Sequence, residues 1–141
     1  MKSCLIIGGA SGLGLSIALA LLNRANKIYI VDCKEIDESD LPPESVASFK
    51  EKATFYKLNL HNGDLSLISN LVDEIDSLII TAGFGRIARF EQLSDPEIKK
   101  LVKVNMLAPI RILKMFYGRI KSNDDFYTAV AGSIADRKSV V

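Results

Sequence analysis

The stretch Ile7-Gly8-Gly9-Ala10-Ser11-Gly12-Leu13-Gly14 lies between an apolar run that begins at Cys4 and a segment whose leucines and isoleucines recur at helical spacing. Strand, glycine turn and helix in this order form the context that a dinucleotide fingerprint requires. Gly8 allows the tight turn, Gly12 lets the backbone approach a pyrophosphate, and Gly14 lets the helix pack closely on the sheet. A glycine-rich turn that merely joins strand to helix is the alternative.

Outward from this turn, short apolar runs alternate with longer segments of helical period. We predict five strands, at residues 4–7, 28–31, 54–58, 78–81 and 126–131, and crossover helices at 12–24, 62–75 and 96–120. Runs without polar alternation suit strands that are covered on both faces, as in a parallel sheet. The sequence therefore predicts an α/β fold of the Rossmann type, a doubly wound parallel sheet in a three-layer αβα arrangement, with ligands bound at the carboxyl ends of the strands.

Two segments carry local signals about helix ends. Ser94 or Asp95 can cap the long helix, because Pro96 fits the first helical position, where its missing N–H has no partner. Pro109 is expected to disturb the same helix. Residues 44–50 are predicted as a weak helix only, since prolines precede them and Val46 is β-branched.

Composition narrows the class of protein. The chain has 141 residues, which predicts a single domain over residues 1–141, and its net charge of +1 provides no field for nucleic acid or an anionic membrane. Two cysteines are too few for a disulfide scaffold or a structural zinc site and indicate free thiols in the cytoplasm. No targeting or membrane-spanning run is evident, and no metal site is expected. A small molecule is the expected partner.

The end of the second predicted strand carries the next candidate residue. Asp32 stands 18 residues after Gly14, near the distance at which an acid accepts hydrogen bonds from the adenosine ribose. A 2′-phosphate would meet this carboxylate, so Asp32 favours NAD over NADP, and Lys34 only partly offsets the repulsion. The alternative is an aspartate that starts a turn. Free N–H groups at the helix start face the pyrophosphate, which adds Ser11 and Leu13 to the predicted binding residues.

The spacing G-x-x-x-G-x-G resembles that of the short-chain dehydrogenase/reductase family. Members usually carry Thr before the first glycine, where this chain has Ile7. Ile80-Thr81-Ala82-Gly83 stands where the family has Asn-Asn-Ala-Gly, so Ala82 and Gly83 match and would lie against the nicotinamide ribose, while the inter-strand bonds of the two asparagines are in doubt. Asn59 stands where the family commonly has Asp beside the adenine and can make a similar contact, and Leu60 matches the apolar residue that follows. His61 receives no role.

The same resemblance implies two catalytic residues. Asn105 matches the asparagine that holds a water in the proton relay, and an amide among apolar residues is costly unless bonded. A helix-surface Asn is the alternative. Ser133 matches the serine that orients the substrate carbonyl, with a plain turn serine as the alternative. The Tyr-x-x-x-Lys that follows in the family is absent, so the chain is truncated relative to it, and Tyr117 with Lys121 has this pattern in the wrong place.

The resemblance implies an NAD-dependent oxidoreductase of which this chain supplies the cofactor-binding part, itself inactive. A non-catalytic NAD(H)-binding module or sensor is the first alternative, and a doubly wound protein that binds another adenine-containing cofactor is a weaker one. The substrate is a small molecule that the sequence does not identify. Relatives often pair through the long helix, which makes a homo-oligomer possible by analogy.

Overall fold

The computed structural model describes residues 2–85, 88–122 and 125–132. Five parallel strands form one sheet in the order β3-β2-β1-β4-β5, so the strand order reverses between β1 and β4. Every strand lies within one residue of its predicted bounds. The strands are β1 Ser3–Ile7, β2 Lys27–Asp32, β3 Ala53–Lys57, β4 Ser77–Ile80 and β5 Tyr127–Val130.

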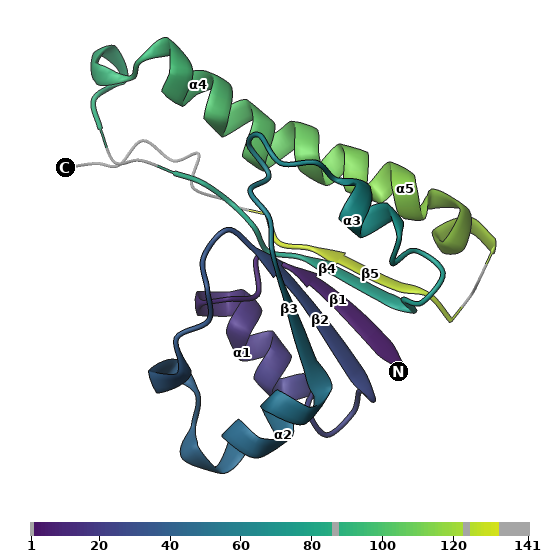
Figure 1. The fold of residues 1–141 in the computed structure, drawn as a ribbon. Coiled ribbons are helices and arrows are strands. Elements are labelled where there is room, and N and C mark those ends of the chain that lie inside the picture. Colours follow the sequence, from purple (N-terminus) through teal and green to yellow (C-terminus); the bar gives the residue numbers. More distant parts are fainter. Residues whose placement is uncertain (1, 86–87, 123–124, 133–141) are drawn as a thin grey trace.

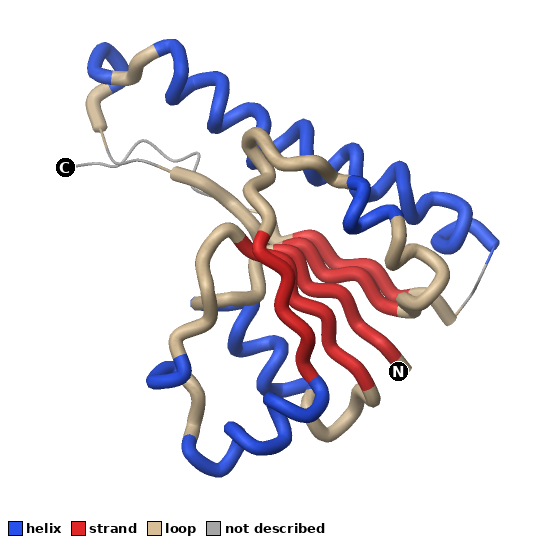
Figure 2. The backbone as a smooth tube through the Cα atoms, in the orientation of Figure 1, coloured by secondary structure: helices blue, strands red, loops and turns tan. Residues whose placement is uncertain are grey.

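Helices cover both faces of this sheet, which gives the predicted three layers (Figure 1). α1 and α2 lie on one face, whereas α3 and the long α4–α5 segment lie on the other; Figure 2 shows the strands between them. The α-helices are α1 Gly12–Leu21, α2 Val46–Lys52, α3 Ser66–Ser69, α4 Asp95–Val102 and α5 Ala108–Ser122, with 3-10 turns at Glu38–Asp40, Pro43–Ser45 and Phe90–Gln92 and a π-helical turn at Lys103–Leu107.

The apolar residues of β1 are divided between two cores. Cys4 and Ile6 pack into the cluster under α1 and α2, whereas Leu5 and Ile7 pack into the cluster under α3 and α5. Because side chains alternate across a strand, a run that is apolar at every position is what two covered faces require. The central strands are thereby fixed from both sides, and their carboxyl ends provide a rigid edge for a site.

The predicted helix at 62–75 is wrong for most of its length. Only α3 is helical, and the residues after it form successive turns, with bonds such as Leu71 N–H to the carbonyl of Ile68 at 3.0 Å. The Asp64 carboxylate accepts the N–H of Ser66 at 2.9 Å and so satisfies a free donor at the start of the helix, which begins at Ser66 and not at residue 62. Ile68, Leu71 and Ile75 are nevertheless buried, so the apolar spacing reflected burial and not a continuous helix.

The weak helix expected at 44–50 is a 3-10 turn that leads into α2, where Phe49 is buried against the first cluster. Burial of this ring on the sheet compensates for the low helix propensity, because tertiary packing outweighs propensity in short helices.

The long helix begins and deforms where the sequence indicates. Ser94 caps it: its hydroxyl accepts the N–H of Glu97 at 3.3 Å, and the Glu97 carboxylate accepts the N–H of Ser94 at 2.8 Å. The helix continues through the π-helical turn Lys103–Leu107 into α5, of which Pro109 is the second residue. A proline cannot donate to the preceding turn, so the irregularity falls where its bond is missing.

Candidate functional site

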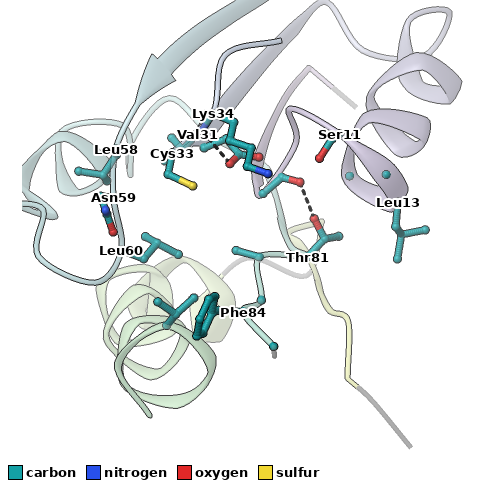
Figure 3. A pocket seen from close by; sticks show the side chains of 18 of the residues that line it. Ser11, Leu13, Val31, Cys33, Lys34, Leu58, Asn59, Leu60, Thr81 and Phe84 are labelled. Carbon is teal, nitrogen blue, oxygen red and sulfur yellow. Dashed lines mark hydrogen bonds between the residues drawn. The ribbon is translucent and has the colours of Figure 1, made fainter. Parts of the chain in front are cut away.

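A cavity of about 630 Å³ opens at the carboxyl edge of the sheet, where the strand order reverses. Segments that follow β1, β2, β3 and β4 surround it, together with Lys100 and Val104 from the long helix. Figure 3 shows Ser11 and Leu13 on one side of this hollow and Asn59 and Leu60 on the other. All ten residues assigned to the cofactor from the sequence line it: Gly8, Ser11, Gly12, Leu13, Gly14, Asp32, Asn59, Leu60, Ala82 and Gly83.

Two glycines of the turn have the left-handed backbone that side chains avoid. Gly8 has φ +91°, and a Cβ on it would lie 2.5 Å from the backbone nitrogen of Ala82. Gly12 has φ +54°, but a Cβ there would meet nothing within 4 Å. Gly8 is therefore required by the contact between the turn and β4, whereas Gly12 leaves open space in front of the backbone at the start of α1.

Gly14 has a different role because it lies inside the first turn of α1. A Cβ at this position would come within 2.1 Å of the Gly8 carbonyl oxygen and 2.6 Å of the Thr81 hydroxyl. Backbone oxygen cannot move aside without breaking the turn. The absence of a side chain lets α1 approach β1 and β4 closely, as the fingerprint predicts.

The Asp32 carboxylate is held by two backbone donors at the end of β2. One oxygen accepts the N–H of Ala10 at 2.9 Å, and the other accepts the N–H of Lys34 at 3.3 Å. The second bond is the turn role that the sequence left as an alternative, and the role toward a ribose stays a prediction. Asp32 is half-buried and lines the cavity, with its carboxylate oriented by the glycine turn itself.

Across the cavity, Asn59 and Leu60 follow β3. The Asn59 side-chain oxygen accepts the N–H of His61 at 2.9 Å, which orients the amide. His61 itself lies outside the main cavity and lines a second, smaller hollow between this loop and α5.

Several lining residues were not identified from the sequence, chiefly those brought in from the long helix and from the loop after β4. The Lys100 ammonium lies 4.0 Å from the centre of the Phe84 ring, a cation–π contact. No local pattern marks this pair, because Lys100 in α4 and Phe84 after β4 are brought together only by the tertiary fold. The further lining residues are Val31, Cys33, Lys34, Leu58, Thr81, Gly85 and Val104.

Asn105 lies in the π-helical turn, and both polar atoms of its side-chain amide bond to the backbone of Phe84. Its oxygen accepts the N–H of Phe84 at 2.8 Å, and its nitrogen donates to the carbonyl of Phe84 at 2.6 Å. The expectation that this amide is bonded is met, although the residue is exposed. Asn105 thus fixes the loop that carries Gly83 and Phe84 into the cavity, and its role with a catalytic water stays a prediction.

The sequence model of the short chain dehydrogenase family matches residues 2–136 of this chain. The chain belongs to the short-chain dehydrogenase family. Members of this family are oxidoreductases. One relative, the short chain dehydrogenase/reductase dpfgG of Gibberella zeae, is 32% identical over 120 residues, which cover 81% of this chain and 44% of the relative. The present chain therefore spans less than half the length of this relative.

Solved structures show the same fold. The bulky-bulky ketone specific alcohol dehydrogenase of Comamonas testosteroni superposes with a TM-score of 0.82 at 24% identity, over 95% of this chain and 55% of that one. A short-chain dehydrogenase of Sphingobium yanoikuyae in complex with NADPH gives 0.79 at 22% identity, over 95% and 54%. An NADH-dependent reductase in complex with NAD gives 0.70 at 21%, over 96% and 61%. At these identities the likeness concerns the fold, and neighbours with either cofactor share it.

The other residues that the family resemblance singled out lie outside the described residues or outside the cavity. Ser133 lies outside the described residues, so its predicted role stays a prediction. Tyr117 is 61% exposed near the end of α5, and Arg119 of the same turn donates to the carbonyls of Val72 and Asp73, which precede β4. Tyr117 and Lys121 therefore lie at the amino edge of the sheet, away from the cavity, as the sequence indicates.

In the described part of the chain, no group of three or more His, Cys, Asp or Glu side chains is placed to hold a metal ion. Over the same residues, none of the helices has both the length and the apolar character needed to span a membrane.

Proposed function

We propose that this chain binds NAD(H) in the cavity and forms the cofactor-binding part of an oxidoreductase that exchanges hydride between the cofactor and a carbonyl or alcohol. The observation that carries the proposal is the meeting of the glycine turn, the Asp32 carboxylate and the Ala82–Gly83 backbone around one hollow. Three separate strand ends supply these groups, and each suits a different part of a dinucleotide.

The residues fit the cofactor from one end to the other. The open space before Gly12 would accept the pyrophosphate, with the N–H groups at the start of α1 directed toward the anion. Asp32 would accept the adenosine ribose hydroxyls, and Asn59 with Leu60 would contact the adenine. Ala82 and Gly83 would lie against the second ribose. When bound, the nicotinamide ring donates or accepts the hydride, while the protein orients it.

NAD is proposed over NADP because of charge. A 2′-phosphate carries negative charge to the position of the Asp32 carboxylate, whose repulsion the exposed Lys34 ammonium offsets only in part. Lys34 lines the cavity but donates its backbone N–H, and not its ammonium, in the bond to Asp32.

Calorimetric titration of the purified chain with NADH, NADPH and S-adenosylmethionine tests this function. We expect NADH to bind at micromolar to millimolar level and more tightly than NADPH, with no heat from S-adenosylmethionine. Failure of NADH to bind at millimolar concentration refutes the proposal. Tighter binding of NADPH retains the family but reverses the choice of cofactor.

The two thiols provide a second, independent readout. Burial raises the pKa of Cys4 to about 12, with a further contribution from Asp76, so at pH 8 this thiol carries almost no reactive thiolate. Cys33 is exposed and lines the cavity. We expect iodoacetamide to modify one cysteine per folded chain, Cys33, and both after denaturation, as measured by intact mass. Saturating NADH should slow the modification of Cys33 several-fold, and equal rates with and without NADH would contradict the proposed site.

A nucleotide-binding module without catalysis is the second candidate. The observation that favours it is the position of Tyr117 and Lys121 at the amino edge of the sheet, which leaves the described cavity without a tyrosine–lysine pair. Assaying the purified chain with NAD⁺ and a panel of alcohols distinguishes the two. No turnover is expected of the module, and measurable reduction of NAD⁺ would count against it.

A further inference from the structure

Thr81 is the first residue after β4, and its hydroxyl lies beneath the glycine turn. It donates toward two carbonyl oxygens, that of Ile7 at 3.2 Å and that of Gly8 at 3.0 Å. Figure 3 marks the bond to Gly8 with a dashed line at Thr81. The Ile7 carbonyl already accepts the backbone N–H groups of Thr81 at 2.8 Å and Ala82 at 3.0 Å. The distinctive contribution of this side chain is therefore its bond to Gly8.

The Gly8 carbonyl belongs to one of the two glycines of the turn that have a left-handed backbone. Gly8 has φ +91°, a conformation that glycine leaves at little cost, so its peptide plane needs an external constraint. Because C=O and N–H point in opposite directions across one peptide unit, holding the carbonyl toward Thr81 directs the N–H of Gly9 the other way. The same carbonyl and the Thr81 hydroxyl also form the surface on which Gly14 of α1 rests.

We propose that Thr81 is a positioning residue, whose hydroxyl fixes the peptide of Gly8 and thereby aligns the turn for the pyrophosphate of the cofactor. The residue before the first glycine, Ile7, has no hydroxyl and is fully buried, so it cannot make this bond. Thr81 supplies the hydroxyl from the neighbouring strand. The inference rests on the proposed NAD(H) function, and it concerns the pyrophosphate in particular.

Thr81→Val tests the role, because valine keeps the shape of threonine and removes the donor. We expect the affinity for NADH and for ADP to fall about five- to tenfold, since one hydrogen bond no longer holds the turn. Adenosine has no pyrophosphate, and its affinity is expected to change about twofold or less. Thr81→Ser retains the hydroxyl and should restore binding of NADH and ADP to near the original level.

Thr128→Val is the matched control. Thr128 stands in β5, and its hydroxyl oxygen is buried without a hydrogen-bond partner in the described part of the chain, so the same substitution removes no bond there. Equal losses in Thr81→Val and Thr128→Val, or a loss in Thr81→Val as large for adenosine as for ADP, would overturn the proposal.

Folding and function are separated by two further comparisons. If the original chain does not bind NADH, the proposed function fails; if it does and Thr81→Val binds NADH and ADP unchanged, only the role of Thr81 fails. Should Thr81→Val not fold, Thr81→Ala is the second hydroxyl-free variant. If both fail to fold while Thr81→Ser folds, the hydroxyl serves the fold and not the cofactor, which also overturns the proposal.

Discussion

Gly14→Ala is expected to abolish measurable NADH binding and to lower the free energy of unfolding by about 3 kcal/mol, the upper range for overpacking. The new Cβ would lie 2.1 Å from the Gly8 carbonyl oxygen, so either α1 moves outward or the turn deforms. Both responses displace the N–H groups at the start of the helix from the cavity. Urea denaturation and calorimetry with NADH measure the two effects.

Gly118→Ala provides the control for this substitution. Gly118 is helical, lies in α5, and a Cβ on it would meet nothing within 4 Å. Alanine should raise the free energy of unfolding there by about 0.5–1 kcal/mol, because it restricts the unfolded chain. A Gly14→Ala protein with unchanged stability and NADH affinity would show that α1 does not need its close approach to β1.

Asp32→Asn is expected to reverse the selectivity between cofactors. The amide keeps the size of the carboxylate and one acceptor oxygen for the N–H of Ala10, but it loses the negative charge. Charge-assisted bonds to the ribose contribute about 1.5–3 kcal/mol, so NADH should bind about tenfold more weakly or worse. NADPH should bind more tightly, because its 2′-phosphate no longer meets a carboxylate.

Titrating both cofactors against Asp32→Asn and Asp37→Asn measures this effect. Asp37 lies in the loop after β2, and its carboxylate accepts bonds from Ser39, which lower the pKa of Asp37. It does not line the cavity, so its substitution should leave the ratio of affinities unchanged. An unchanged ratio in Asp32→Asn would place the ribose away from this carboxylate.

The sheet could be predicted well because its signal is local. Each strand is a short apolar run between polar or glycine residues, and parallel pairing follows from the intervening helices. The backbone of residues 62–75 could not be predicted. Ile68, Leu71 and Ile75 recur at helical spacing, but successive turns bury the same side chains without a continuous helix. Periodicity reports which side chains face the core, and several backbones satisfy it.

The residues of the site also divide into those that the sequence predicts and those that it does not. Gly8, Asp32 and Ala82 were predicted because each follows a strand, and the carboxyl ends of parallel strands meet at one edge. Thr81 appeared only as a departure from the family pattern, since its hydroxyl acts on the neighbouring strand. Lys100 depends on how α4 packs, which no local pattern encodes.

The division of β1 between two apolar cores has a consequence for strand alignment. A slip of this strand by one residue would exchange its two faces without exposing polar atoms, so hydrophobicity discriminates poorly between alignments. Polar bonds at its ends provide the discrimination: the Asp76 carboxylate accepts the N–H groups of Lys2 at 2.8 Å and Ser3 at 3.2 Å, and Thr81 holds the opposite end. The few polar contacts at the ends of the central strand thus select one strand pairing among several of similar hydrophobicity. The same contacts fix where the glycine turn lies relative to β4.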